Sequence, residues 1–247
     1  ISAKIITGTA ANKTYDSLTT ASITLLNVEV DDIVTVTGNF STRDVSSNKP
    51  VTGTITGADS GNYSLSSVSN ANITTKSITG TSTNRIYDNT TNVTITLNNV
   101  EAFDLSNVTL SGSVSNKLVD NGKTVTGTLA GSRAFNYTLS SISTVNITKK
   151  DCSGVTQNKT YDGTTTATIN IPLNGVISGD TVGCSADFDT RHFGSSKTVT
   201  GTLTLTDAGN YNLVSLTNAN ITQKTITGTT ADKTYDRTDI ASITLNG

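Results

Sequence analysis

The stretch Asn146 to Gly163, NITKKDCSGVTQNKTYDG, recurs along the chain and decides how it is organised. Related stretches begin at Asn72 (NITTKSITGTSTNRIYDN) and Asn220 (NITQKTITGTTADKTYDR), and a shorter one opens the chain at Ile1 (ISAKIITGTAANKTYDS). The tyrosines of these stretches, Tyr15, Tyr87, Tyr161 and Tyr235, stand 72, 74 and 74 residues apart. Such a fixed period indicates a tandem-repeat protein.

The period divides the chain into small domains. We assign residues 1–4 to the tail of a preceding repeat, residues 5–76, 77–150 and 151–224 to three repeats, and residues 225–247 to the start of a fourth repeat. Both ends then fall inside a repeat, so we expect a longer array. A domain of about 74 residues buries only about 60–65% of the surface of its unfolded chain, so contacts with neighbouring repeats should matter for stability.

The composition favours strands and turns and excludes several classes of protein. Thr, Val and Ile suit pleated strands, while Asn, Gly, Asp and Ser suit turns. A net charge of −2 gives no basic face for nucleic acid. No apolar stretch approaches the roughly 20 residues of a membrane span.

Within one repeat, alternating apolar and polar residues predict six or seven strands separated by turns. In the first repeat the predicted strands are Ile5–Thr9, Ala21–Val28, Ile33–Phe40, Val51–Thr56, Tyr63–Leu65 and Asn72–Thr74. The polar stretch from Ser41 to Lys49 is predicted to be a loop. This spacing is typical of a small antiparallel, immunoglobulin-like β-sandwich, and therefore of an all-β chain of tandem sandwiches.

The joins between repeats contain no flexible spacer. Between Asn72 and Thr81 there is no Pro, and the first Gly is Gly80. Ile73 and Ile78 are five residues apart, which places them on opposite faces of a continuous strand, as a chain passing from one core to another would require. We therefore predict stiff joins and a rod-like array.

All seven tyrosines belong to one of two repeated landmarks. The Tyr-Asp pairs are Tyr15-Asp16, Tyr87-Asp88, Tyr161-Asp162 and Tyr235-Asp236, and the Asn-Tyr tyrosines are Tyr63, Tyr137 and Tyr211. In the Tyr-Asp pair, the Asp is expected to hydrogen-bond the backbone two residues on, with Gly163 tolerating a positive φ, and the Tyr to satisfy a loop carbonyl. A ligand-binding Tyr/Asp pair is the functional alternative, but its recurrence in every repeat favours a structural role.

We expect no catalytic, cofactor or metal site. Asp59 and Asp207 could suggest calcium loops, but Arg133 occupies the matching place in the second repeat, so turn chemistry is favoured. His192 is the sole histidine and has no nucleophile motif nearby, which indicates a surface loop residue. The recurring lysines lack a matching acid pattern for an isopeptide crosslink.

Two cysteines occur, both in the third repeat. Cys152 takes the place of Ile6 and Ile78, and Cys184 aligns with Val36. Both positions are predicted to face the core, so we predict a disulfide across the sandwich, with buried free thiols as the alternative.

The segment NKTYDGTTTATI, from Asn158 to Ile169, together with the later VTGT, NY and NIT motifs, resembles the YDG and MBG repeats of large bacterial surface adhesins and filamentous-haemagglutinin-like exoproteins. The likeness covers all three repeats and the fourth partial one. Only the third repeat has the full YDG; the others carry Ser17, Asn89 or Arg237 after the Asp. The resemblance implies a secreted, surface-displayed stalk of β-domains and no catalytic residue.

These observations favour a structural stalk or fibre-forming region of an extracellular adhesin at the cell surface, holding a binding tip or partner at a distance. The expected partners are neighbouring repeats, other copies in a fibre, and a host or cell-surface glycan or protein. The alternative is a multivalent glycan- or protein-binding module, for which Phe103, Phe135 and Phe193 are the candidate aromatics. An enzyme is the least supported class.

Overall fold

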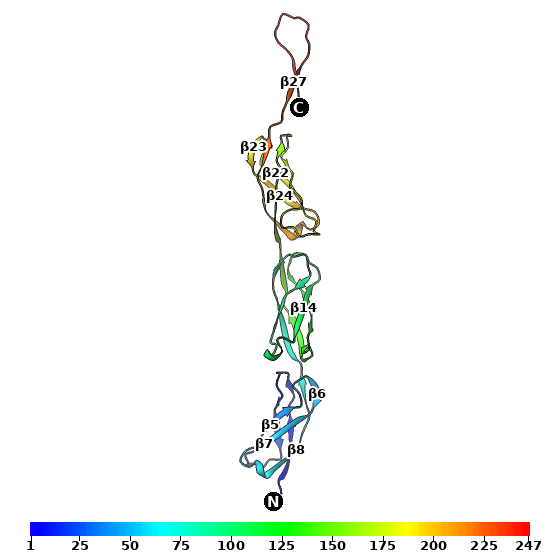
Figure 1. The fold of residues 1–247 in the computed structure, drawn as a ribbon. Coiled ribbons are helices and arrows are strands. Elements are labelled where there is room, and N and C mark those ends of the chain that lie inside the picture. Colours follow the sequence, from blue (N-terminus) through cyan, green and yellow to red (C-terminus); the bar gives the residue numbers. More distant parts are fainter. The chain divides into compact units, whose positions relative to one another are not determined.

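The computed structural model describes all residues from Ile1 to Gly247, which form two compact units. Unit 1 comprises residues 1–84, 91–115 and 122–145, and unit 2 comprises residues 85–90, 116–121 and 146–247. Two loops of the second repeat therefore belong to the same unit as the third repeat. The chain is all β, apart from four short 3-10 turns (Figure 1).

The strands of the first repeat are β1 (Lys4–Ala10), β2 (Lys13–Thr14), β3 (Thr20–Ala21), β4 (Ile23–Leu26), β5 (Thr35–Phe40), β6 (Ser46–Lys49), β7 (Val51–Thr56), β8 (Tyr63–Val68) and β9 (Ala71–Thr74). Those of the second are β10 (Lys76–Ser82), β11 (Arg85–Ile86), β12 (Asn92–Val93), β13 (Ile95–Asn98), β14 (Thr109–Val114), β15 (Asp120–Lys123), β16 (Val125–Ala130), β17 (Tyr137–Ile142) and β18 (Val145–Thr148). Those of the third are β19 (Lys150–Gly154), β20 (Lys159–Thr160), β21 (Thr166–Ala167), β22 (Gly183–Phe188), β23 (Gly194–Lys197), β24 (Val199–Thr204), β25 (Tyr211–Leu216) and β26 (Ala219–Thr222). Residues 225–247 contain β27 (Thr227–Thr230) and β28 (Ile243–Asn246), and the 3-10 turns are η1 (Ser60–Asn62), η2 (Ala102–Asp104), η3 (Ala134–Asn136) and η4 (Ala208–Asn210).

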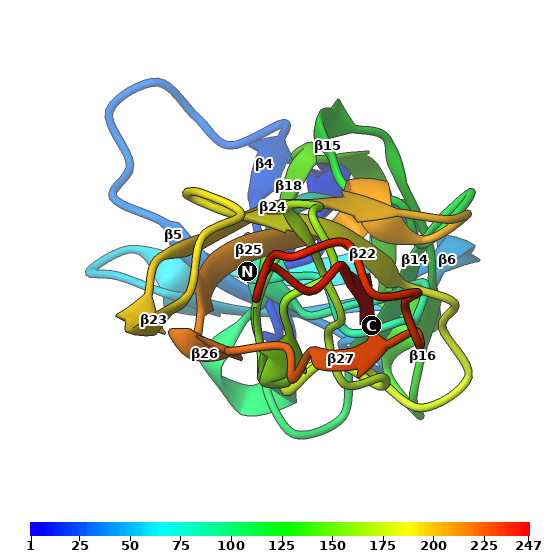
Figure 2. The same ribbon diagram turned by 90° about the horizontal axis from the view of Figure 1, so that it is seen from above.

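The three repeats contain small sheets in a related arrangement, but one sheet of the third repeat has two strands where its counterparts have three. The first repeat has the strand orders β4-β1-β8, β3-β5-β7 and β2-β9-β6, and the second has β13-β10-β17, β12-β14-β16 and β11-β18-β15. The third has β19-β25, β21-β22-β24 and β20-β26-β23, and Figure 2 shows β23 beside its antiparallel partner β26.

The prediction of purely antiparallel sheets is wrong. The first long strand of every repeat pairs in parallel with the strand that follows the NY motif: β1 with β8, β10 with β17, and β19 with β25. Each pair shifts register at one equivalent step, Ile6/Thr7, Ile78/Thr79 or Cys152/Ser153. A shared irregularity of this kind shows that the three repeats have one fold.

The TGT motif in the first strand has a packing reason. A Cβ added at Gly8 would lie 2.7 Å from Cγ2 of Ile23, and one at Gly80 would lie 2.7 Å from Cγ2 of Ile95. Real Cβ atoms do not approach so closely, so glycine lets the neighbouring strand's isoleucine pack against the backbone. The strand therefore alternates threonine with a position that only glycine fills.

Much of the strand pattern was predicted, but the first repeat has nine strands where six or seven were predicted, and β2 was not among them. The stretch from Ala21 to Val28 is broken into β3 and β4, and the predicted loop from Ser41 to Lys49 contains β6. β6 is polar throughout and pairs with β9 through its backbone, so its side chains carry no alternating signal.

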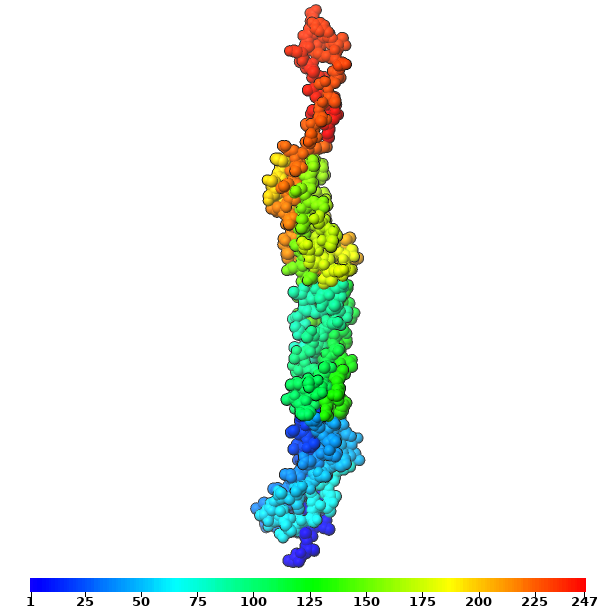
Figure 3. Space-filling view, viewed as in Figure 1, coloured from blue at the N-terminus to red at the C-terminus, as the bar shows by residue number.

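The apolar core of unit 1 runs from the first repeat into the second. One cluster contains Tyr15 and Ile73 of the first repeat together with Ile78, Val108 and Tyr137 of the second. The space-filling view shows the blue and cyan surface of the first repeat adjoining the green surface of the second (Figure 3). The expectation that Ile73 and Ile78 serve separate cores is therefore wrong in this unit, because both pack into one cluster.

Candidate functional site

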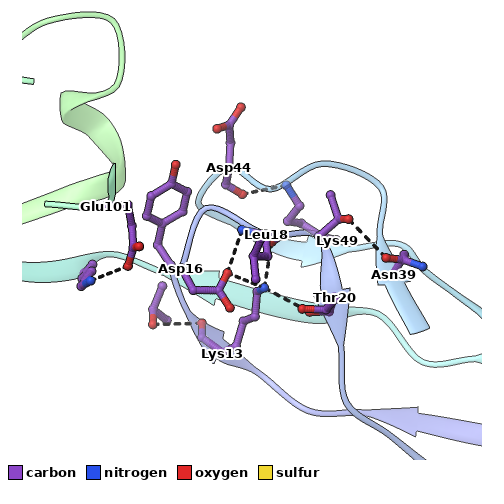
Figure 4. A network of polar contacts seen from close by, with 12 residues as sticks. Lys13, Asp16, Leu18, Thr20, Asn39, Asp44, Lys49 and Glu101 are labelled. Atoms are coloured by element: carbon purple, nitrogen blue, oxygen red, sulfur yellow. Dashed lines mark hydrogen bonds and ion pairs between the residues drawn. The ribbon is translucent and has the colours of Figure 1, made fainter. Parts of the chain in front are cut away.

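The Tyr-Asp turn of the first repeat is held by a lysine. Asp16 Oδ1 accepts the backbone N–H of Leu18 at 3.0 Å, which is the predicted hydrogen bond two residues on. Lys13 Nζ donates to Asp16 Oδ1 at 2.7 Å and to the carbonyls of Leu18 and Thr20 at 2.8 and 3.0 Å (Figure 4). These bonds all lie within the first repeat, so the turn is held without contacts from a neighbouring repeat.

The same turn recurs in the other three copies, of which only the third repeat has a glycine after the Asp. Asp88, Asp162 and Asp236 each accept the N–H two residues on, and Arg85, Lys159 and Lys233 take the place of Lys13. The residue after the Asp has a positive φ in all four copies: 62° at Ser17, 64° at Asn89, 83° at Gly163 and 65° at Arg237. The turn geometry therefore does not depend on glycine.

The turn presents its tyrosine to the next repeat. The backbone N–H of Tyr15 donates to the carbonyl of Thr74 at 2.9 Å, which ties the turn to the NIT strand β9. The side chain is 1% exposed, and its hydroxyl donates to Asp104 Oδ2 in the second repeat at 2.6 Å. The sequence-based expectation of a loop carbonyl as partner is wrong, because the partner is a carboxylate of the neighbouring repeat.

We call the group that receives Tyr15 the socket of the second repeat: Asp104, Asn136 and Tyr137. Asp104 is fully buried, and Tyr137 also donates its hydroxyl to Asp104 Oδ2, at 2.8 Å. The rings of Tyr15 and Tyr137 meet edge to face at 5.4 Å, a favourable arrangement for aromatic pairs. Both hydroxyls reach Oδ2, whereas the buried Oδ1 has no hydrogen-bond partner and lies 4.0 Å from Nε of Arg133.

Three contacts surround this socket in unit 1. The backbone N–H of Val45 donates to Asn136 Oδ1 at 2.9 Å, and Arg133 forms an ion pair with Asp44. The guanidinium of Arg43 lies 3.7 Å from the ring centroid of Phe103, within the range of a cation–π contact. We call the tyrosine-to-carboxylate bond and these contacts the first junction.

The second junction lies within unit 2 and has a similar centre, in which the hydroxyl of Tyr87 donates to Asn89 Oδ1 at 3.4 Å. Tyr87 is 1% exposed, and its ring meets that of Tyr211 at 5.6 Å, again edge to face. Tyr211 donates to Asp180 Oδ2 at 2.6 Å, and the side chain of Asp180 is fully buried. The backbone N–H of Val119 donates to Asn210 Oδ1 at 3.1 Å, as Val45 does to Asn136.

Burial and the carboxylates keep these tyrosines protonated. Burial, followed by the hydrogen bond to Asp104, raises the pKa of Tyr15, and burial followed by Asp180 raises the pKa of Tyr87. Burial is also the largest cause that raises the pKa of Tyr137, and that of Tyr211 to about 12. The hydroxyls are therefore donors over the physiological range of pH.

Residues 2–72 and 148–220 match the family model of the YDG domain, and together they make up more than half of the chain. The chain belongs to the YDG-domain family. Neither a curated protein nor a solved structure matches it significantly. The second repeat lies outside the two matched segments, yet it has the same sheet order, register shift and Tyr-Asp turn, so we describe all three as YDG repeats.

The carboxylates of the sockets are the residues that sequence reasoning missed. Asp32, Asp104 and Asp180 precede the NY tyrosine that donates to them by 31, 33 and 31 residues. This near-constant spacing is a signal in the sequence. It was not recognised because an aspartate between two strands looks like an ordinary turn residue.

The other predicted site residues lie apart from the junctions or make turns. Asp59 Oδ2 accepts the N–H of Ile33, and Asp207 Oδ2 accepts that of Thr181, both at 2.8 Å, as turn chemistry requires. His192 is exposed in a loop. The structure contains no group of three or more His, Cys, Asp or Glu arranged to hold a metal ion, and no helix long and apolar enough to cross a membrane.

The predicted disulfide between Cys152 and Cys184 is not formed, because both residues are free thiols in the structure. Cys152 is buried on β19 and Cys184 is half-buried on β22, so they belong to different sheets of the third repeat. Burial raises the pKa of both thiols. Because the thiolate is the form that is oxidised, these cysteines are poorly disposed to react.

Proposed function

We propose that this chain is a non-catalytic, stiff segment of a stalk or fibre in an extracellular bacterial adhesin, and that it holds a binding tip or partner away from the cell surface. The observation that carries the proposal is the buried tyrosine of one YDG repeat in the socket of the next. It recurs at both junctions together with a bond from a backbone N–H to the asparagine of the socket, whereas the charged contacts differ.

Bending at a junction would break contacts between neighbouring repeats. A flexible linker leaves the orientation of neighbouring domains free, because no contact has to break when they move. Bending at the first junction would instead pull the hydroxyl of Tyr15 from Asp104 and open the apolar cluster around Ile73 and Ile78. Leaving a buried carboxylate short of a donor is costly, so the junction resists bending.

The alternative of a multivalent binding module has weaker support. Its candidate aromatics Phe103, Phe135 and Phe193 are all exposed, but they lie in different loops, and Phe103 contacts Arg43. A binding surface that gains strength from repetition needs the same residue at the same place in each repeat. The aromatics that do recur are the tyrosines of the junctions.

The distance between two spin labels tests the proposed stiffness. Thr52 and Thr126 are exposed and occupy equivalent places in the first two repeats, so Thr52→Cys and Thr126→Cys place one label on each side of the first junction. Cys152→Ile and Cys184→Val remove the native thiols. Double electron–electron resonance spectroscopy should give a narrow distance distribution. Tyr15→Ala should broaden it, and Tyr235→Ala should leave it unchanged. A distribution that is already as broad in the parent chain would contradict a stiff segment.

A further inference from the structure

The base of the first repeat contains a socket like those of the second and third repeats, but it holds no tyrosine from another repeat. Tyr63 donates to Asp32 Oδ2 at 2.5 Å, and the backbone N–H of Glu29 donates to the hydroxyl of Tyr63 at 3.0 Å. The equivalent bonds join Tyr137 to Asp104 and Glu101, and Tyr211 to Asp180 and Ile177. The carboxylate, the ring and the backbone donor are therefore already in place.

The difference lies in what covers the socket. Asn136 and Asn210, which accept backbone N–H groups from the preceding repeat, are buried, whereas the equivalent Asn62 is exposed. Asp104 accepts hydroxyls from two tyrosines, but Asp32 accepts one. Of the acceptors that the filled sockets use for a neighbouring repeat, Asn62 is exposed here and Asp32 is half-buried.

A cavity of about 310 Å³ lies over these groups. Its lining includes Lys4, Glu29, Asp32, Asn62 and Tyr63. Its wall has the same ion pair as the filled socket of the second repeat, because Lys4 pairs with Glu29 as Lys76 pairs with Glu101. The wall therefore does not need rebuilding to receive a tyrosine.

The protonation chemistry points the same way. The hydrogen bond to Asp32 is the largest cause that raises the pKa of Tyr63, whereas burial is the largest cause for Tyr137 and Tyr211. The hydrogen bond is thus present in the first repeat. Tyr63 is 7% exposed, against 6% for Tyr137, so the missing cover is at Asn62 and not at the tyrosine.

We propose that Asp32, Asn62 and Tyr63 form a docking site for the Tyr-Asp tip of another YDG repeat when such a repeat is joined directly before Ile1. The incoming tyrosine donates its hydroxyl to Asp32 and packs edge to face on Tyr63. A backbone N–H beside it donates to Asn62 Oδ1, as Val45 and Val119 do to Asn136 and Asn210. The inference deepens the proposed function, on which it rests, by naming the partner of this site.

An extended chain tests the proposal. Residues 1–4 match Ile221–Lys224 in place, so a copy of residues 151–220 placed directly before Ile1 continues the NIT strand into β1. Hydrogen exchange of the Glu29 amide, which donates to Tyr63, reports on the docking site. We expect this amide to exchange about tenfold more slowly in the extended chain than in the original chain, the effect of about one net hydrogen bond.

Two variants make the result specific. Tyr161→Ala in the added copy, and separately Asp32→Ala, should abolish the slowing, while Tyr161→Ala in the original third repeat should not. Protection of the Glu101 amide, which donates to Tyr137, shows that unit 1 remains folded in each variant. The spin-label distance across the first junction does not depend on Asp32. A narrow distance distribution with no slowing of Glu29 exchange would therefore contradict this inference but not the stalk proposal.

The inference is overturned if the added repeat leaves Glu29 exchange unchanged, or if the slowing survives Tyr161→Ala in the added copy. It is also overturned if raising the concentration of the original chain slows Glu29 equally, since the occupant would then be a second copy.

Discussion

The two junctions share a centre and differ at the rim. In both, a tyrosine that is 1% exposed meets the ring of an NY tyrosine beside a buried aspartate. The rim of the first junction adds the Arg133–Asp44 ion pair and the contact between Arg43 and Phe103. At the second, Lys117 takes the place of Arg43 and lies 3.5 Å from Asp180. The comparison indicates that the aromatic–carboxylate centre joins YDG repeats, while the charged rim varies.

The largest expected effect comes from removing the central tyrosine. Tyr15→Ala and Tyr87→Ala should each lower the free energy of unfolding of the affected unit by about 3–5 kcal/mol, because a buried ring and its hydroxyl are lost. Tyr235, which is 85% exposed, gives the matched control. Tyr235→Ala should change the free energy of unfolding by less than about 0.5 kcal/mol. Urea unfolding measures all three. Equal effects of Tyr15→Ala and Tyr235→Ala would contradict a special contribution of the buried junction tyrosines to stability.

Alkaline pH should weaken both junctions. The folded-state pKa of each central tyrosine is raised, so the unfolded chain loses these protons first as the pH rises above the ordinary value of 10.0. The stabilisation is complete below that value and is lost as the pH rises through the folded pKa, which is about 12 for Tyr211. Each tyrosine should contribute a loss of about 1.4 kcal/mol per pH unit in this window.

Chemical denaturation at about pH 9 and about pH 11 measures this loss. Tyr15→Phe should reduce the pH dependence of unit 1, because phenylalanine carries no proton. A free energy of unfolding that stays constant over this range would show that the hydroxyls are not held as donors.

Removing one hydroxyl should cost less than removing the ring. Tyr15→Phe keeps the aromatic packing but removes a hydrogen bond to a buried carboxylate, so we expect a loss of about 1.5–3 kcal/mol in unit 1. Tyr161→Phe is the control, since Tyr161 carries the same turn but is only half-buried. Thermal unfolding of the two variants compares them, and a Tyr15→Phe chain as stable as the parent would remove the hydrogen bond from the account.

The smallest effect should come from the rim. Arg133→Ala breaks a partly exposed ion pair with Asp44, so we expect a loss of at most about 1 kcal/mol in unit 1, reduced further by salt. Arg43→Ala, which removes the contact with Phe103, gives a second change at the same rim. Urea midpoints at low and high salt measure both. If Arg133→Ala lowered the free energy of unfolding more than Tyr15→Phe does, the rim would contribute more to stability than the central hydrogen bond, contrary to our expectation.

Much of the fold could be predicted from the sequence, because period and alternation are local signals. The strands around TGT and VTGT lie where their alternating residues indicate, and the Asp turns make the predicted backbone bonds. The parallel pairing of β1 with β8 could not be predicted, since the side-chain pattern of a strand does not identify its partner. β6 was missed because its pairing uses the backbone of a polar segment.

Only one side of the candidate site, the Tyr-Asp turn, could be predicted from the sequence. The repeated tyrosines marked the Tyr-Asp turn, but the partner of Tyr15 lies 89 residues further along the chain, in a different repeat. Such a contact becomes visible only when the two repeats are packed together. The spacing from Asp104 to Tyr137 was the available clue, and it needed the structure to give it meaning.

A double-mutant cycle between Tyr15→Phe and Asp104→Ala tests most directly whether this hydrogen bond couples neighbouring repeats. The free energy of unfolding of unit 1 is measured by urea denaturation for the parent, the two single variants and the double variant. We predict a coupling energy of about 1–3 kcal/mol, as for residues that share a buried network. Losses that add to within about 0.5 kcal/mol would contradict it, because the two residues would then act independently.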